Sequence, residues 1–232
     1  MNPSERYLRP AKTVLLTGAG FTKPFGGFLA DEMWAVILNQ PEIRQYPDLR
    51  KRMLEELNYE TLYDEVLASD HYTPDARNAF ANAIRNAYKH MHENICTRSG
   101  LEHRSRACRV CTDFIGRFAG QEGTQEKGFV FTLNQDLFVE QFYSASRSLM
   151  KIPGLHNPKW FRSQPHSTIE EEDRVSLPVD KAVEREKAKC WTKSSERLVY
   201  LKLHGSYAWR AHDGSEIMVI GHSKTNIIEN ES

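Results

Sequence analysis

The sequence lacks the features that would mark a membrane protein or a nucleic-acid-binding protein. Its 232 residues contain no apolar run long enough to cross a bilayer, and residues 1–13 are polar and charged, unlike a signal peptide. Lysine plus arginine number 31 and aspartate plus glutamate also number 31, so there is no net basic charge to attract a polyanion. We therefore expect a cytoplasmic protein with no membrane partner and no direct nucleic-acid binding.

Cysteine is scarce, with four residues in the chain: Cys96, Cys108, Cys111 and Cys190. Cys108 and Cys111 have the spacing of half a structural zinc site, but a closed site needs four ligands and no second pair follows. In a reducing compartment the thiols stay mostly reduced. We expect no metal, and a zinc site is the minor alternative.

Apolar residues make up 40% of the chain, which is enough for the core of one large domain over residues 1–232. Short apolar runs predict buried strands at 13–16, 128–132, 198–203 and 217–220. The fold class that they favour is α/β, with a Rossmann-like, doubly wound, mostly parallel sheet. Such a sheet needs further strands after Gly221, so we expect part of the fold to be missing or supplied by a partner.

Helical spacing of apolar residues fills most of the chain between these strands. It predicts helices at 28–38, 49–67, 73–91, 106–118 and 138–149. Residues 48–120 then form a helical block inserted into the α/β frame. Residues 151–196 interleave proline with charge, which predicts a surface insertion or lid.

A glycine-rich motif, Gly18-Ala19-Gly20-Phe21-Thr22, follows the first predicted strand. Without a β-carbon, glycine lets the backbone approach a diphosphate closely, and the next helix presents its amides to the anion. The third glycine of the dinucleotide pattern G-x-G-x-x-G is absent because Lys23 takes its place, and the next glycines are Gly26 and Gly27. A tight structural turn is the alternative interpretation.

Two further motifs also follow predicted strands directly. Asn134 and Asp136 come after the strand at 128–132, where ligands bind at the carboxyl end of a parallel strand. Their side chains can pair with a carboxamide such as that of nicotinamide, although either could simply cap the next helix. His204, beside Gly205, follows the strand at 198–203 and is suited to act as a general base.

Together the three motifs resemble the sirtuin (silent information regulator) family, in which a Gly-Ala-Gly-x-Ser turn, a Gln-Asn-x-Asp segment and a His-Gly pair hold and cleave NAD. The resemblance implies that Asn134 and His204 are catalytic. It also implies a binding site for NAD, the substrate, at the following residues: Gly18, Ala19, Gly20, Phe21, Thr22, Gly26, Asp136 and Gly205.

The chain departs from the protein-deacylating sirtuins at two places. Gly26-Gly27-Phe28-Leu29 replaces their Pro-Asp-Phe-Arg segment, and no cysteine follows His204 to build their zinc ribbon. The pattern is more similar to bacterial sirtuin-like proteins of antiphage defence. These hydrolyse NAD to nicotinamide and ADP-ribose, form homo-oligomers and work with partners such as a HerA-like ATPase. An NAD-dependent protein deacylase and a non-enzymatic NAD or ADP-ribose sensor are the alternatives.

Overall fold

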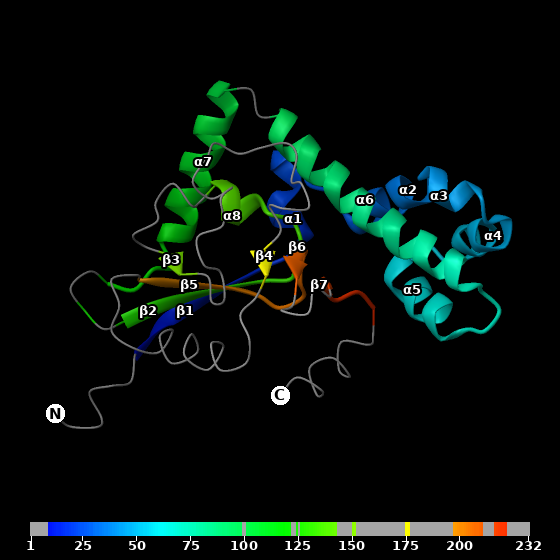
Figure 1. Cartoon of the computed structure of the whole chain (residues 1–232). Coiled ribbons are helices and arrows are strands. Elements are labelled where there is room, and N and C mark those ends of the chain that lie inside the picture. Colours follow the sequence, from blue (N-terminus) through cyan, green and yellow to red (C-terminus); the bar gives the residue numbers. More distant parts are fainter. Residues whose placement is uncertain are drawn as a thin grey trace.

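Four parallel strands form the main sheet, in the order β1-β2-β5-β3. The computed structural model describes residues 9–98, 101–121, 124, 126–142, 150–151, 175–176, 197–210 and 216–221. Within them the chain is a mixed α/β protein, with the sheet on one side and a group of helices on the other (Figure 1). The strands are β1 (Arg9–Thr17), β2 (Glu126–Thr132), β5 (Leu198–Lys202) and β3 (Met150–Lys151). The first three confirm the strands predicted at 13–16, 128–132 and 198–203.

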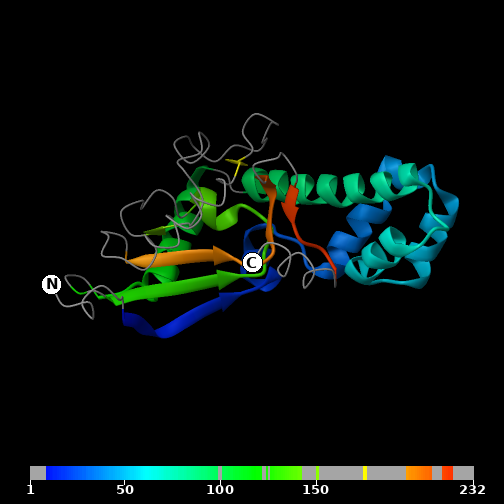
Figure 2. The same ribbon diagram turned by 60° about the horizontal axis from the view of Figure 1, so that its bottom comes forward.

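The register brings the carboxyl ends of β1, β2 and β5 level with one another. Thr17 pairs with Thr132, and Thr132 pairs with Lys202. Figure 2 shows these strands side by side, with their arrowheads toward the helices. The segments that follow the three strands therefore begin at one edge of the sheet.

A second, smaller sheet has the strand order β4-β6-β7, and its central strand β6 follows β5 along the chain. Its strands are β4 (Val175–Ser176), β6 (Gly205–Arg210) and β7 (Glu216–Met218). β6, which starts immediately after His204, was not predicted. The strand predicted at 217–220 corresponds to β7, but β7 pairs antiparallel with β6 and does not extend the parallel sheet.

The helical block is built around the long helix α6 (Pro74–Arg98), against which α2 (Ala30–Leu38), α3 (Pro41–Arg44) and α5 (Tyr59–Ala68) pack. Thr73 precedes this helix as predicted, and its Oγ1 accepts a hydrogen bond from the amide of Ala76 at 3.2 Å. Fully buried Ile37, Leu62 and Phe80 belong to the core. The bounds of this block differ from the predicted 48–120: α2 and α3 precede residue 48, and the helix at 101–116 lies beside the sheet instead (Figure 1). The block also contains α4 (Pro47–Glu55), and α1 (Ala19–Thr22) and η2 (Lys23–Phe25) lead into it from β1.

The single helix predicted at 49–67 is wrong, because the chain breaks between α4 and α5. Asn58 caps α5 there: its Oδ1 accepts from the amides of Glu60 and Thr61 at 3.0 and 3.3 Å. Asparagine is favoured at this position because its side-chain oxygen accepts hydrogen bonds from the first helical amides, which have no acceptor within the helix. The apolar spacing of 49–67 therefore hides the start of a second helix.

Two more helices, α7 (Leu101–Gly116) and α8 (Phe138–Phe142), pack against each other beside the sheet (Figure 1). α7 starts before and ends before the helix predicted at 106–118. The rest of the helix predicted at 138–149, and nearly all of the insertion predicted at 151–196, lie outside the described residues. Among the helices described, none has the length and apolar character needed to cross a membrane.

Candidate active site

The three sequence motifs meet at the carboxyl edge of the parallel sheet. Backbone hydrogen bonds tie their first residues together: the amide of Leu133 donates to the carbonyl of Thr17 at 3.0 Å, and that of Leu203 donates to Thr132 at 2.9 Å. The parallel register therefore brings residues far apart in the chain next to one another. Ligands of α/β proteins bind at this edge.

A cavity of about 360 Å³ opens beside these turns. Its size lies within the range of about 300–1,000 Å³ that is typical of small-molecule sites. On the side of the sheet, the residues that line it are Gly18, Ala19, Thr22, Leu133, Asn134, Gln135, Asp136 and His204. We call this side the sheet wall; it holds both predicted catalytic residues and four of the predicted binding residues.

The opposite side, which we call the helical wall, was not predicted. Its residues come from the start of α2 and from α5 and α6: Phe28, Leu29, Ala30, Met33, Tyr59, Glu60, Tyr88 and Met91. Most are apolar or aromatic, and helical periodicity assigns such residues to a core. The one indication of a ligand site on this wall is that two tyrosines and a glutamate lie among its apolar residues.

Four predicted binding residues are not among those that line the cavity. Phe21 packs its ring against Phe114 and Phe138, with centroids 6.0 and 6.2 Å apart. Gly26 and Gly205 adopt positive φ angles of 104° and 63°, which favour glycine for backbone reasons alone. Gly20 lies inside the short helix α1 and faces open space.

Gly18, like Gly20, is not required as glycine by its backbone conformation or by a neighbouring atom. Its φ of −135° suits any residue, and a β-carbon at this position would meet no atom within 4 Å. Gly18 also lines the cavity. Glycine at this position therefore leaves open space at the edge of the cavity.

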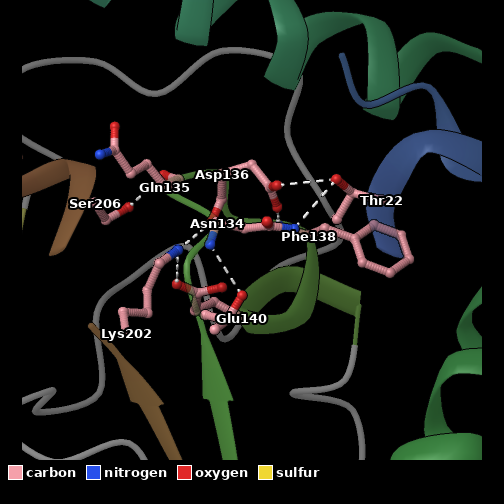
Figure 3. A network of polar contacts seen from close by, with 9 residues as sticks. Thr22, Asn134, Gln135, Asp136, Phe138, Glu140, Lys202 and Ser206 are labelled. Carbon is pink, nitrogen blue, oxygen red and sulfur yellow. Dashed lines mark hydrogen bonds and ion pairs between the residues drawn. The ribbon is translucent and has the colours of Figure 1, made fainter. Parts of the chain in front are cut away.

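Thr22 connects the first motif to the second (Figure 3). Its buried hydroxyl donates to Oδ2 of Asp136 at 3.1 Å and accepts from Nδ2 of Asn134 at 3.4 Å. Gly27 makes room for it, because a β-carbon there would approach Oγ1 of Thr22 to 2.5 Å. The carboxamide of Asn134 is thus oriented by the glycine-rich segment.

Asp136 also performs the capping role that was the alternative interpretation. Its Oδ1 accepts from the amide of Phe138 at 2.9 Å, at the start of α8. Burial raises the pKa of the Asp136 carboxyl, and the positive charge of Lys202 partly opposes that rise. Because both carboxylate oxygens already accept from the protein, Asp136 mainly holds the turn in shape.

A buried ion pair lies beneath the turn. Nζ of Lys202 is 2.7 Å from Oε1 of Glu140, and both side chains are fully buried. The same ammonium group donates to the carbonyl of Asp136 (Figure 3). It also lies 5.8 Å from the centre of the Trp209 ring. Burial raises the pKa of Glu140, with Lys202 acting against it. The pair fixes the second motif to the strand that leads to His204.

Gln135 fixes the small sheet to the same turn. Its side-chain Nε2 donates to the backbone carbonyl of Val219 at 2.7 Å, and its backbone carbonyl accepts from Oγ of Ser206 at 2.9 Å. The amide of Val219 in turn donates to the carbonyl of His204 at 3.1 Å. These bonds hold the backbone on both sides of His204, so the imidazole projects from a fixed turn.

The charges of the cavity are acidic. Glu60 and Asp136 line it, and no lysine or arginine is among its lining residues in the described part of the chain. Such a cavity suits a neutral or cationic group better than a phosphate. A diphosphate would have to lie toward Gly18, where the first amides of α1 have no acceptor within their helix.

Within the described residues, no group of three or more His, Cys, Asp or Glu side chains is placed so that it could hold a metal ion. Cys96 and Cys111 are free and buried, and the side chain of Cys108 lies outside the described residues.

In comparisons with known proteins, the sequence matches no family model and no curated protein. The resemblance to sirtuins therefore rests on the three motifs.

Proposed function

We propose that this chain is an NAD hydrolase, which cleaves the bond between nicotinamide and ribose to give nicotinamide and ADP-ribose. One observation carries the proposal: Gly18, Asn134 and His204 come from three distant segments and line the same cavity. A capping asparagine, a structural histidine and a tight glycine turn would each be ordinary alone. Their convergence at the ligand-binding edge of a parallel sheet favours a shared function.

The proposal includes a Rossmann-like, doubly wound frame. Its support is the set of parallel strands with β1 leading into the glycine turn, the order found in dinucleotide-binding units. The Gly18 turn would then lie against the diphosphate. The nicotinamide, which is cationic in NAD, would occupy the acidic cavity.

The roles of the residues follow from their chemistry. Asn134 carries an amide that can donate to and accept from the carboxamide of nicotinamide. His204 orients a water molecule toward C1′ of the ribose and accepts its proton. The water oxygen forms a bond to C1′, and the C1′–N1 bond breaks with its electron pair moving to the ring nitrogen. Neutral nicotinamide leaves, and the proton passes from His204 to solvent.

The test is nicotinamide release from NAD by the purified chain and by His204→Ala and Asn134→Ala. We expect both variants to lose the activity, while His71→Ala, at an exposed histidine outside the cavity, keeps it. Activity retained in both site variants contradicts the mechanism. Release that requires an acetyl-lysine peptide identifies a deacylase instead, and tight NAD binding without turnover identifies a sensor.

The biological setting is a prediction from the resemblance. We propose that a cytoplasmic homo-oligomer of this chain depletes NAD in antiphage defence, together with a partner such as a HerA-like ATPase. Nicotinamide release measured with and without the products of neighbouring genes tests that setting. Stimulation of the activity by one of them would support it.

A further inference from the structure

The helical wall carries a pair of tyrosine hydroxyl groups. Tyr59 at the start of α5 and Tyr88 in the middle of α6 both line the cavity. Their hydroxyl oxygens lie 3.2 Å apart, and both residues are buried, with 5% and 7% of their surface exposed. Two helices of the block therefore bring a bonded pair of hydroxyl groups together on residues that line the cavity.

The pair has one hydrogen more than its mutual bond uses. Each hydroxyl carries one hydrogen, and one of the two is donated across the 3.2 Å contact. The other hydrogen is available to an acceptor in the cavity that both residues line. Burial raises the pKa of Tyr59 to about 12, so the group stays protonated and remains a donor near neutral pH.

Glu60 adds a carboxylate to the helical wall. It follows Tyr59 in the first turn of α5 and lines the same cavity. Asn58 fixes the position of both residues by capping the helix, since its Oδ1 accepts from the amide of Glu60 at 3.0 Å. A donor and a carboxylate on one wall match a sugar hydroxyl, which both donates and accepts, and carboxylates bind ribose hydroxyls in dinucleotide sites.

We propose that Tyr59, Tyr88 and Glu60 bind the hydroxyl groups of the nicotinamide ribose, so that the helical wall determines specificity for the sugar. This inference rests on the proposed NAD hydrolase function. The sheet wall, with Asn134 and His204, then acts on the ring and the glycosidic bond. The ribose lies between the two walls, where its hydroxyl groups reach α5 and α6.

The experiment compares the wild type with Tyr59→Phe/Tyr88→Phe, the two single variants and Glu60→Gln. Tyr72→Phe is the control, because Tyr72 is a buried tyrosine of the same block that does not line the cavity. Each protein is assayed for nicotinamide release from NAD and from analogues that lack the 2′ or the 3′ hydroxyl of the nicotinamide ribose. Thermal unfolding shows that each variant is folded.

We expect the double tyrosine variant to raise KM for NAD about tenfold, as for the loss of a buried hydrogen bond to substrate, with smaller effects of the single variants. On at least one deoxy analogue, the double variant and the wild type should differ much less in kcat/KM than they do on NAD. Comparing the two proteins on each substrate cancels the intrinsic reactivity of the analogue. A merely structural role would lower kcat/KM equally on all three substrates.

Two results overturn the inference in distinguishable ways. If the wild type releases nicotinamide and the double variant behaves like Tyr72→Phe, or loses activity equally on all substrates, the ribose assignment is wrong and the proposed function stands. If the wild type neither binds NAD nor releases nicotinamide from it, the proposed function fails and the ribose assignment fails with it.

Discussion

The two walls of the cavity are stabilised in different ways. The sheet wall is held by buried polar contacts, among them the pair Lys202–Glu140 and the bridge from Thr22 to Asp136. The helical wall belongs to a block that packs through apolar side chains on α6, and it carries the hydroxyl contact Tyr59–Tyr88.

The two kinds of contact differ in how tightly they fix the positions of the side chains that line the cavity. Buried polar networks have few geometries that satisfy every donor and acceptor, so they fix Asn134 and His204 closely. Apolar packing is non-directional and tolerates small adjustments. We infer that the sheet wall provides the reactive geometry and that the helical wall provides the fit to the ligand.

The largest expected effect comes from breaking the buried pair. Lys202→Met leaves Glu140 buried without its partner, and removal of one member of a buried pair costs about 3–5 kcal/mol of stability. Denaturant unfolding measures the loss. Because Lys202→Met/Glu140→Met leaves no uncompensated charge, the double variant should lie closer to the wild type. A single variant within about 1 kcal/mol of the wild type would show that the pair does not stabilise this wall.

The next effect separates ligand binding from stability. Gly18→Ala adds a methyl group to the cavity where the protein leaves open space, so we expect unchanged unfolding and a rise of about tenfold or more in KM for NAD. Gly116→Ala, in α7, is the matched control, since its β-carbon also meets nothing within 4 Å and it does not line the cavity. Equal KM values for both variants would remove Gly18 from the site.

A smaller effect concerns the pH dependence of the sheet wall. Because burial raises the pKa of Asp136 in the folded chain, its contribution to stability falls as pH rises from its ordinary value of 3.8 through the raised value. Asp136→Asn does not titrate. Its melting temperature relative to the wild type should therefore rise as the pH increases above the ordinary carboxyl pKa of 3.8. Parallel curves for the two proteins would contradict the raised pKa.

The smallest effect concerns the helical block. Arg52 binds Glu65 with two hydrogen bonds, of 2.8 and 2.7 Å, which join α4 to α5 near the surface. Since exposed pairs contribute little and are screened by salt, Arg52→Ala should lower the melting temperature slightly, and less at high NaCl concentration. Nicotinamide release should be unchanged. A loss as large as that of Lys202→Met would remove the contrast between the two walls.

The strands and the sheet wall could be predicted because their signals are local. The apolar runs at 128–132 and 198–203 predicted β2 and β5, and Asn134 and His204 stood out as polar residues directly after them. The parallel register then brought them together. Two local features were missed: a new helix, capped by Asn58, starts within the helix predicted at 49–67, and β6 begins at Gly205, which was interpreted only as a binding residue beside the histidine.

The helical wall could not be predicted, because its signal is tertiary. Tyr59, Tyr88 and Met91 fit the apolar periodicity of core helices, and only the folding of α5 and α6 toward the sheet shows that they line a cavity. The buried pair was missed because charged residues such as Lys202 and Glu140 are almost never fully buried unless paired. Nothing in the sequence spacing joins residues that are 62 positions apart.

The most direct measurement is a crystal structure of His204→Ala, which should bind NAD without cleaving it, in complex with NAD. We expect the nicotinamide ring beside Asn134, the ribose hydroxyls at Tyr59 and Glu60, and the diphosphate at the Gly18 turn. NAD bound at another surface, or seated with its adenine in this cavity and its nicotinamide outside, would contradict it.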